Sequence, residues 1–307
     1  MQTILGAGGN IGKPLAKELI PYDPHIRLMS RNPQKINETD ELFPGDLTDK
    51  ERVEKAVEGS HIAYLVAGLA YKLKEWKEKW PVIMQNIIDA CKKHNTKLVF
   101  FDNPYMYDPV YIENLTEETP VNPASKKGKI RAAIAENLLQ EMKAGNLNAM
   151  LVRSSDFYGP GVGSSVIMET VYKKLKDGKT PIWLGNPSAW HSLTYTPDAA
   201  KATALLGNTA DAYGQVWHLP TESEKLTGKQ WVELFAKELK RPAKFKAVLG
   251  KMVRFIGNFV PLFRELGDVM IHYDSNYYFN CEKFKKRFPD FRITGPEEGV
   301  RETVKGG

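Results

Sequence analysis

Hydrophobic positions in the first twenty residues change from a strand-like run to helical spacing. A short apolar strand is expected at the start, and it leads into a turn with glycines at Gly6, Gly9 and Gly12. From Gly12 to Ile20 the apolar residues recur with the period of an amphipathic helix. The pattern therefore predicts a strand, a tight turn and a helix in direct succession.

The same alternation continues through the first 155 residues. Residues 62–67 form a continuous apolar run, as expected of a parallel strand buried on both faces. The further expected strands are 26–30, 42–47 (with a turn), 97–101 and 149–153, and the expected helices are 50–57, 75–94 and 126–142. Strands alternating with helices predict a doubly wound, Rossmann-type α/β fold with a parallel sheet covered on both faces.

After about residue 155 the regular alternation of strands and helices ends. A glycine- and proline-rich loop at 158–163 precedes a helix near 165–177, a strand is expected at 216–219, and the rest is mostly helical and rich in aromatic residues. We expect one continuous structural unit with two parts. Their ranges are 1–160 with 190–220 for the nucleotide-binding core, and 161–189 with 221–307 for a smaller, mostly helical substrate lobe.

Composition and charge narrow the class of protein. The 307 residues are 42% hydrophobic and 26% charged, which is ordinary for a soluble globular protein, and 43 Lys and Arg against 37 Asp and Glu give a net charge of +6. No long basic run appears, so no nucleic-acid partner is expected. The apolar stretch from Val248 to Tyr273 is interrupted by charged residues and Pro261, which favours two buried helices and no membrane partner.

Cysteine and histidine usage points to no metal site. Cys91 and Cys281 are the only cysteines, and the six histidines form no helical pair of metal ligands. We expect a reduced, cytoplasmic protein without a signal peptide, because the first residues already belong to the expected nucleotide-binding strand. A monomer or homodimer is expected.

The opening glycine turn has the chemistry of a dinucleotide site. Glycines allow a tight turn and a close approach of the backbone to a pyrophosphate, and the helix that follows directs N–H groups and its positive dipole end to the phosphate. Arg31 follows the second strand, where an acidic residue would bind a ribose 2′-hydroxyl and an arginine suits a 2′-phosphate. NADP is therefore the expected cofactor, with NAD as the alternative. The small pair Ala67-Gly68 would let a ribose or nicotinamide lie against the backbone.

Together these features resemble the extended and atypical short-chain dehydrogenase/reductase proteins, the NAD(P)-dependent epimerase/dehydratase-like branch. The marks of the resemblance are the glycine turn, Arg31, Gly45-Asp46-Leu47, Ala67-Gly68 and the segment 153–161. The resemblance implies that Asp46 bonds the adenine amino group with Leu47 beside the ring. It also implies that Asn10 and Ile11 offer backbone N–H groups to the pyrophosphate.

The resemblance further implies that Lys129 binds the nicotinamide ribose, but the expected catalytic pair is incomplete. The family pattern is Tyr-x-x-x-Lys, and Ser125 stands four residues before Lys129. Asn103 occupies the strand-end position of the usual catalytic serine, four residues before Tyr107. A serine hydroxyl cannot replace a tyrosine as general acid, because phenol is far more acidic.

Two readings of this site remain open. In the first reading, another residue near the nicotinamide supplies the proton. The candidates are Tyr105, Tyr107, Asp156, Tyr158 and His191. Each of them also has an ordinary packing interpretation. Asp156 takes the position of a substrate-facing asparagine of the family, and Trp183 and Trp190 suggest a ring-bearing or sugar-like ligand. The chain is then an NAD(P)-dependent oxidoreductase or epimerase-like enzyme for a small carbonyl or sugar-derived substrate. Alternatively, it is a non-catalytic NAD(P)-binding sensor or regulator.

Overall fold

The structure, a computed structural model, describes residues 1–163, 165–259, 265, 267 and 270–307. The chain divides into two compact units. The core unit consists of Met1–Asn103, Lys129–Arg153 and Ala199–Leu219, and the second unit consists of Pro104–Gly128, Ser154–Asp198 and Pro220–Gly307. The domain boundaries expected from the sequence stay a prediction.

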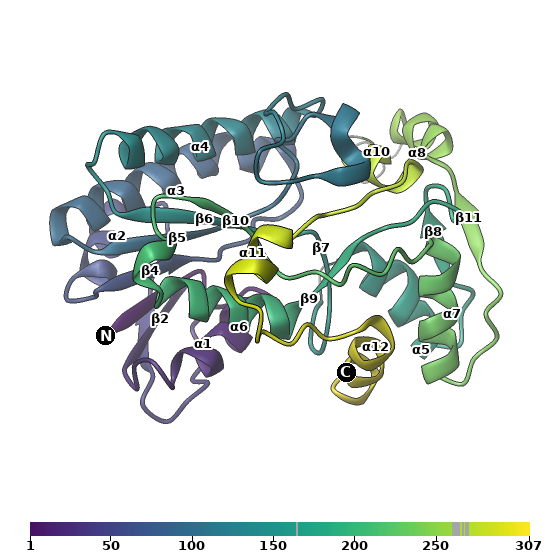
Figure 1. Cartoon of the computed structure of the whole chain (residues 1–307), viewed down its shortest axis with the longest axis horizontal. Coiled ribbons are helices and arrows are strands. Elements are labelled where there is room, and N and C mark those ends of the chain that lie inside the picture. The colour runs from purple at the N-terminus through teal and green to yellow at the C-terminus, as the bar shows by residue number, and fades with distance from the viewer. Residues whose placement is uncertain (164, 260–264, 266, 268–269) are drawn as a thin grey trace. The chain divides into compact units, whose positions relative to one another are not determined.

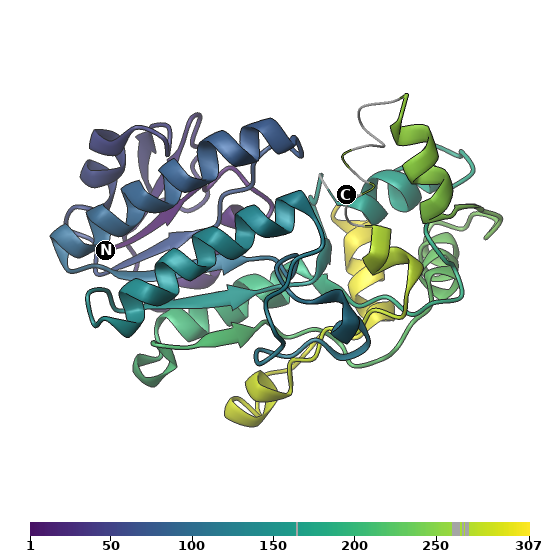
Figure 2. The same cartoon turned by 90° about the horizontal axis from the view of Figure 1, so that it is seen from above.

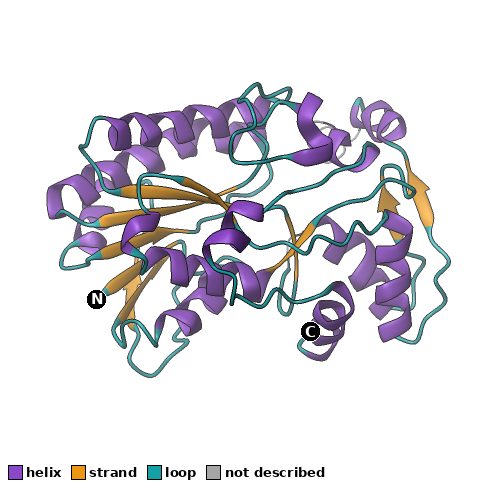
Figure 3. Ribbon diagram, in the orientation of Figure 1, coloured by secondary structure: helices purple, strands orange, loops and turns teal. Residues whose placement is uncertain are grey.

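A seven-stranded parallel sheet forms the centre of the core unit (Figures 1 and 3). In spatial order its strands are β10 (Val216–His218), β6 (Ala149–Arg153), β5 (Lys97–Asp102), β4 (Ile62–Leu65), β1 (Gln2–Leu5), β2 (Ile26–Ser30) and β3 (Glu41–Pro44). The predicted Rossmann-type sheet is therefore confirmed. Its central strands β1, β4, β5 and β6 are short and almost fully buried because both faces are covered, whereas the edge strand β3 is largely exposed.

Helices cover the two faces of this sheet (Figure 1). One face carries α1 (Gly12–Leu19) and α6 (Thr196–Gly207), and the other carries α2 (Lys50–Val57), α3 (Leu73–His94) and α4 (Lys126–Lys143). Neighbouring residues of β1 show the alternation: Gln2 Nε2 donates to Asn208 Oδ1 just beyond α6 at 2.8 Å, whereas Thr3 Oγ1 donates to Ala56 O of α2 at 3.2 Å. Successive side chains of a strand point to opposite faces of the sheet, so adjacent residues of one strand contact the helical layers on both faces.

The order of the strands reverses between β1 and β4. From β1 the chain moves outward through β2 and β3, and it then crosses back to β4 on the other side of β1. In open α/β sheets, ligands bind beyond the carboxyl ends of the strands at such a reversal. The loops after β1 and β4 are therefore the part of the core unit where a ligand is expected.

The second unit contains short elements around its own aromatic core. Its strands form two parallel pairs, β7 (Asp156–Tyr158) with β9 (Leu193–Tyr195) and β8 (Ile182–Leu184) with β11 (Lys246–Val248). Its larger helices are α7 (Gly228–Glu238), α8 (Gly250–Gly257) and α12 (Pro296–Lys305). Shorter elements are the turns Pro109–Asn114 and Met168–Tyr172 and the helices α5 (Lys173–Lys176), α10 (Met270–Asp274) and α11 (Glu282–Arg287). The buried core includes Tyr158, Trp183, Trp231, Phe235 and Val300.

One expectation is confirmed and one differs from the structure in this unit. The helix expected near 165–177 is present over residues 166–176, and its middle part, Met168–Tyr172, is π-helical before it continues into α5. The stretch 248–273 was expected to form buried helices, but α8 exposes several large apolar side chains, while residues 260–264, 266, 268 and 269 lie outside the described part of the chain. No helix among the described residues has the length and apolar character needed to cross a membrane.

Candidate functional site

The first glycine turn lies directly against the loop that follows β4. Gly6 has φ +93°, and a Cβ at this position would lie 2.5 Å from the Cα of Ala67. The N–H groups of Gly6 and Ala7 both donate to Met29 O of β2, at 2.9 and 3.0 Å. Gly6 is therefore required both by its left-handed backbone and by the contact between the two loops at the strand reversal.

The other two glycines of the turn have different surroundings. A Cβ on Gly12 would lie 2.3 Å from Ala7 O, so this residue allows α1 to pack closely on the turn. A Cβ on Gly9 would have its nearest contact at 3.4 Å, with Val66 O, which is an ordinary separation. The bare backbone of Gly9 is thus not needed for folding, and this fits a position that a ligand approaches.

A buried hydroxyl faces this turn from the end of β2. Ser30 Oγ is buried and finds no hydrogen-bond partner among the residues that the structure describes. It lies 3.7 Å from the place where a Cβ on Gly8 would be, and the neighbouring Arg31 is exposed. Buried polar atoms are nearly always paired, so this hydroxyl is available to an acceptor atom of a ligand that binds beside the turn.

The predicted adenine residues form a fixed turn after β3. The Asp46 carboxylate accepts hydrogen bonds from Thr48 N at 2.9 Å and Thr48 Oγ1 at 2.8 Å. The backbone bond from Thr48, together with the charge of Arg31, holds the pKa of Asp46 below its ordinary value. Leu47 is buried, and its carbonyl accepts from the buried Asn86 Nδ2 at 3.1 Å. Asp46 and Arg31 are thus brought near each other on one side of the core unit.

A buried ion cluster, which the sequence analysis missed, supports the carboxyl end of β5. Asp102 is buried and accepts from Arg131 Nε at 2.7 Å and from Arg153 Nε at 3.4 Å, and its carboxylate also accepts from Asn103 N at 2.8 Å. The Arg131 guanidinium lies 4.4 Å from the ring centroid of Trp80. The cluster fixes the backbone of Asn103, one of the predicted catalytic positions. No sequence signal indicated it, because the three charges come from three separate elements.

The predicted catalytic positions at the start of α4 are occupied as follows. Ser125 is buried, and its Oγ accepts the N–H of Gly128 at 2.8 Å, which is the geometry of a helix N-cap. Lys129 is exposed. Its neighbour Lys127 is fully buried, and its ammonium pairs with the carboxylate of Glu265. Lys129 was selected by its spacing from Ser125 only, and spacing does not reveal which lysine is buried.

Two polar side chains of the second unit, those of His191 and Tyr273, meet at Asp156. Asp156 Oδ2 lies 3.0 Å from His191 Nε2 and accepts from Tyr273 OH at 2.7 Å, while His191 Nδ1 lies 3.0 Å from His272 O. The Tyr273 ring stacks on His191 with centroids 4.3 Å apart. Both ring nitrogens of His191 therefore lie within hydrogen-bond distance of an oxygen atom. Tyr273 was not identified from the sequence, because it lies 117 positions from Asp156.

Burial and charge shift the pKa of Asp156 in opposite directions. Burial raises the pKa of Asp156, but the hydrogen bond and charge of His191 outweigh it, so the pKa is lowered overall. Burial, followed by the charge of Asp156, raises the pKa of Tyr273 well above its ordinary value. The side chain of Asp156 is 20% exposed, whereas that of His191 is 2% exposed. Asp156 is therefore the member of the cluster most open to a ligand.

The remaining tyrosine candidates differ in their surroundings. Tyr158 is fully buried in the core of the second unit, with its ring 5.2 Å from Trp231, and burial raises its pKa well above the ordinary value. Tyr107 is also buried. Tyr105 is partly exposed, and its ring lies 5.6 Å from that of His272. For Tyr158 the packing interpretation accounts for every contact described.

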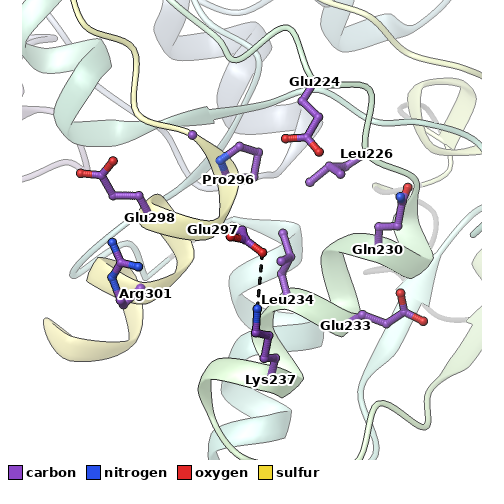
Figure 4. A pocket seen from close by; sticks show the side chains of 11 residues that line it. Glu224, Leu226, Gln230, Glu233, Leu234, Lys237, Pro296, Glu297, Glu298 and Arg301 are labelled. Carbon is purple, nitrogen blue, oxygen red and sulfur yellow. Dashed lines mark hydrogen bonds and ion pairs between the residues drawn. The ribbon is translucent and has the colours of Figure 1, made fainter.

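An open groove of about 690 Å³ lies between α7 and α12 (Figure 4). Its polar lining is mostly acidic, and one glutamate, Glu297, pairs with Lys237 at 3.4 Å. None of the residues expected at the functional site lines this groove. It is therefore separate from the candidate site.

Comparison with known proteins identifies relatives of the sequence. The model of the NAD dependent epimerase/dehydratase family matches residues 3–219. The uncharacterized protein y4nL of Sinorhizobium fredii is 27% identical over 192 residues, which are 60% of this chain and 53% of that protein. Short-chain dehydrogenase/reductase family 42E member 1 of Danio rerio is 25% identical over 178 residues, or 52% of this chain and 46% of that protein. The chain thus spans about half the length of the curated relatives it matches.

Solved structures share the fold at low identity. UDP-glucose 4-epimerase of Thermus thermophilus in complex with NAD aligns over 100% of this chain and 98% of its own, with a TM-score of 0.79 and 17% identity. UDP-glucose 4-epimerase of Thermotoga maritima with UDP-glucose has the same coverage, a TM-score of 0.80 and 16% identity. The family match covers the core unit from residue 3 onward, including the glycine turn and the strand reversal. The chain belongs to the NAD-dependent epimerase/dehydratase family.

Proposed function

We propose that this protein is an NADP-preferring oxidoreductase or epimerase-like enzyme that acts on a small carbonyl or sugar-derived substrate. The observation that carries the cofactor preference is the orphaned Ser30 hydroxyl beside the glycine turn, next to the exposed Arg31. A hydroxyl and a guanidinium are suitable donors for a 2′-phosphate. A nicotinamide cofactor supplies hydride transfer when bound.

Each part of the cofactor has a proposed set of contacts. The backbone around Gly9, Asn10 and Ile11 holds the diphosphate, since the turn opens a helix N-terminus there. Asp46 and Leu47 hold the adenine, and Ala67 with Gly68 lies against the nicotinamide half. Around Gly68 the described residues leave open space within 4 Å of a Cβ position, which suits a close ligand. Lys129 remains the proposed contact to the nicotinamide ribose.

The proton transfer needs a group other than the family tyrosine. Ser125 stands at the tyrosine position, and its hydroxyl already serves as the cap of α4. We assign the proton transfer instead to Asp156 together with His191, whose 3.0 Å contact forms an acid–base pair. Asp156 is partly open, so it is the group that would meet a substrate hydroxyl or carbonyl. The sugar epimerases that share the fold support a sugar-derived substrate.

A non-catalytic NAD(P)-binding sensor is the second candidate. Two observations favour it: the Ser125 hydroxyl is committed to a helix cap, and Lys129 is exposed. In this case the cofactor site is retained, and the chemistry is lost.

Cofactor titration tests the proposed preference. Arg31→Ala should weaken NADPH binding by about 10- to 100-fold, as expected for a charge-assisted contact, and should change NADH binding by less than about twofold. Ser30→Ala should weaken NADPH about tenfold without loss of stability, because it removes no internal hydrogen bond. Lys55→Ala, at an exposed site on α2, is the control. Equal losses for both nucleotides in Arg31→Ala would remove the 2′-phosphate argument.

A substrate panel separates the enzyme from the sensor. Sugars, nucleotide sugars and simple ketones are incubated with each nucleotide, and the nicotinamide absorbance or product formation is followed. Turnover that is lost in Asp156→Asn and Lys129→Ala, with cofactor binding measured in parallel, supports the enzyme. Tight cofactor binding without turnover of any substrate supports the sensor.

A further inference from the structure

The surface around β11 and α8 has a charge imbalance that the whole chain does not have. Between Leu239 and Phe259 the sequence contains six Lys and Arg residues and no Asp or Glu. The chain as a whole carries 43 basic against 37 acidic residues. This segment of the second unit is thus more basic than the chain as a whole.

Helix α8 exposes its largest apolar side chains. It packs through Gly250, Val253 and Gly257, which are buried, and Gly250 N donates to Asp274 Oδ1 of α10 at 2.9 Å. Four large apolar side chains on α8 and directly beside its ends are exposed: Leu249 is 48% exposed, Met252 52%, Phe255 67% and Phe259 76%. The Phe255 and Phe259 rings meet edge to face with centroids 5.8 Å apart. The spacing of three and four residues places these side chains on one face of the helix.

Exposed cations occur on α8 and on the segment that leads into it. Lys251 and Arg254 are exposed on α8. Lys246 is exposed at the start of β11, and Lys244 is exposed two residues before that strand. The acidic group described next to them is Asp274, whose Oδ2 lies 3.7 Å from Arg254 Nη2. We name the surface formed by Leu249, Met252, Phe255 and Phe259 with Lys244, Lys246, Lys251 and Arg254 the basic apolar face. Figures 1 and 2 show α8 at the periphery of the second unit.

We propose that the basic apolar face docks the protein reversibly on an anionic membrane surface. Aromatic and aliphatic side chains on one side of a helix enter the boundary between lipid headgroups and acyl chains, while flanking lysines and arginines bind anionic headgroups. A row of exposed aromatic and aliphatic side chains with a polar border is typical of an interaction site. A peripheral contact of this kind needs no spanning helix, so it revises the expectation of no membrane partner.

The same charges disfavour a second copy of the chain as the occupant. A twofold interface would place the same patch of both copies against each other and bring their cations together. Among the described residues, the ion pair formed by these cations is that of Arg254 with Asp274. An anionic lipid surface complements both the charges and the apolar row. The proposal is independent of the cofactor and of the catalytic residues.

Vesicle co-sedimentation of the full chain tests the proposal. The probes are vesicles of phosphatidylcholine alone and of equal parts phosphatidylcholine and phosphatidylserine, at low and high salt. We expect binding to the anionic vesicles only, and a decrease when salt screens the charges. Phe255→Ser with Phe259→Ser should weaken binding at least about tenfold because the buried apolar area is lost. Lys251→Glu should weaken it by about tenfold.

Matched controls keep the result specific. Val110→Ser removes an exposed apolar side chain of the turn Pro109–Asn114, and Lys286→Glu reverses an exposed charge of α11. Both should bind as the unchanged protein does, and circular dichroism with thermal unfolding verifies that all variants fold. Absence of binding to anionic vesicles, or equal binding to both compositions, would overturn the proposal. It would also be overturned by a dimer that the phenylalanine variants abolish while vesicle binding is absent.

Discussion

At the scale of single residues, the neighbours of a side chain decide which chemistry remains open to it. Ser125 is the clearest example, because its hydroxyl accepts the N–H of Gly128 and is therefore held as a helix cap. Ser30 is the opposite case, since its buried hydroxyl has no partner among the described residues. Both are serines next to the family's motif positions, and only their contacts distinguish a structural hydroxyl from one that is available to a ligand.

The Asp156 cluster should contribute to stability in a pH-dependent way. Because folding lowers the pKa of Asp156, the unfolded chain takes up the proton at a higher pH than the folded protein does. The contribution of the cluster to the free energy of unfolding is therefore present above about pH 4, and it is lost as the pH falls through the pKa of the folded state. Asp156→Asn should lower the free energy of unfolding by about 1–3 kcal/mol near neutral pH, and this difference from the unchanged protein should shrink in acid. Chemical denaturation at several pH values measures this.

Asp89→Asn, which breaks the exposed pair with Lys50, is the control and should cost less than about 1 kcal/mol. A cost for Asp156→Asn that stays constant from neutral pH into acid would show that the ionised carboxylate is not what stabilises the cluster.

At the scale of elements, the glycine turn combines requirements of folding with requirements of binding. Gly6 and Gly12 have no room for a side chain, because the backbones of Ala67 and Ala7 lie at their Cβ positions. Gly9 has such room. The same three-glycine motif therefore contains two positions set by packing within the core unit and one that packing does not explain.

This difference predicts opposite effects of two alanine substitutions. Gly12→Ala should destabilise the protein by about 1–3 kcal/mol, because the methyl group would lie 2.3 Å from Ala7 O. Gly9→Ala should change stability by less than about 0.5 kcal/mol and still weaken cofactor binding about tenfold, because the methyl group occupies the space of the diphosphate. Thermal unfolding and nucleotide titration separate the two effects. Unchanged cofactor affinity in Gly9→Ala would contradict the proposed diphosphate contact.

At the scale of the whole molecule, each compact unit contains one buried cysteine. Cys91 lies in α3 of the core unit, and Cys281 precedes α11 in the second unit. Burial raises the pKa of Cys91 to about 12, and burial also raises that of Cys281. Neither thiol is reactive in its folded surroundings. The two residues are therefore separate reporters of local opening.

Cofactor binding should protect Cys91 from a thiol reagent. At a nucleotide concentration of about one hundred times Kd, opening of the core unit should be suppressed about 100-fold, and labelling of Cys91 should slow by the same factor. Mass spectrometry resolves the two sites, and Cys281 shows how far the second unit opens together with the core. If bound NADPH leaves the Cys91 rate unchanged, the nucleotide does not bind the core unit.

The sequence by itself determined the architecture of the core unit. Strands with apolar runs, helices with a 3.6-residue period and glycines at a tight turn are local signals, and they predicted the ranges 26–30 and 50–57 as the structure has them. The order of strands and helices was enough to predict the Rossmann-type sheet, because a parallel sheet requires crossover helices on its faces.

Tertiary structure alone decided the chemistry of individual side chains. The Asp156–His191–Tyr273 cluster and the pairing of Asp102 with Arg131 join residues far apart in the chain, and no local pattern encodes such contacts. The exposure of α8 was likewise invisible, because its apolar period matches that of a buried helix. Periodicity reports which residues share a face, but only packing decides whether that face is covered by protein or left open.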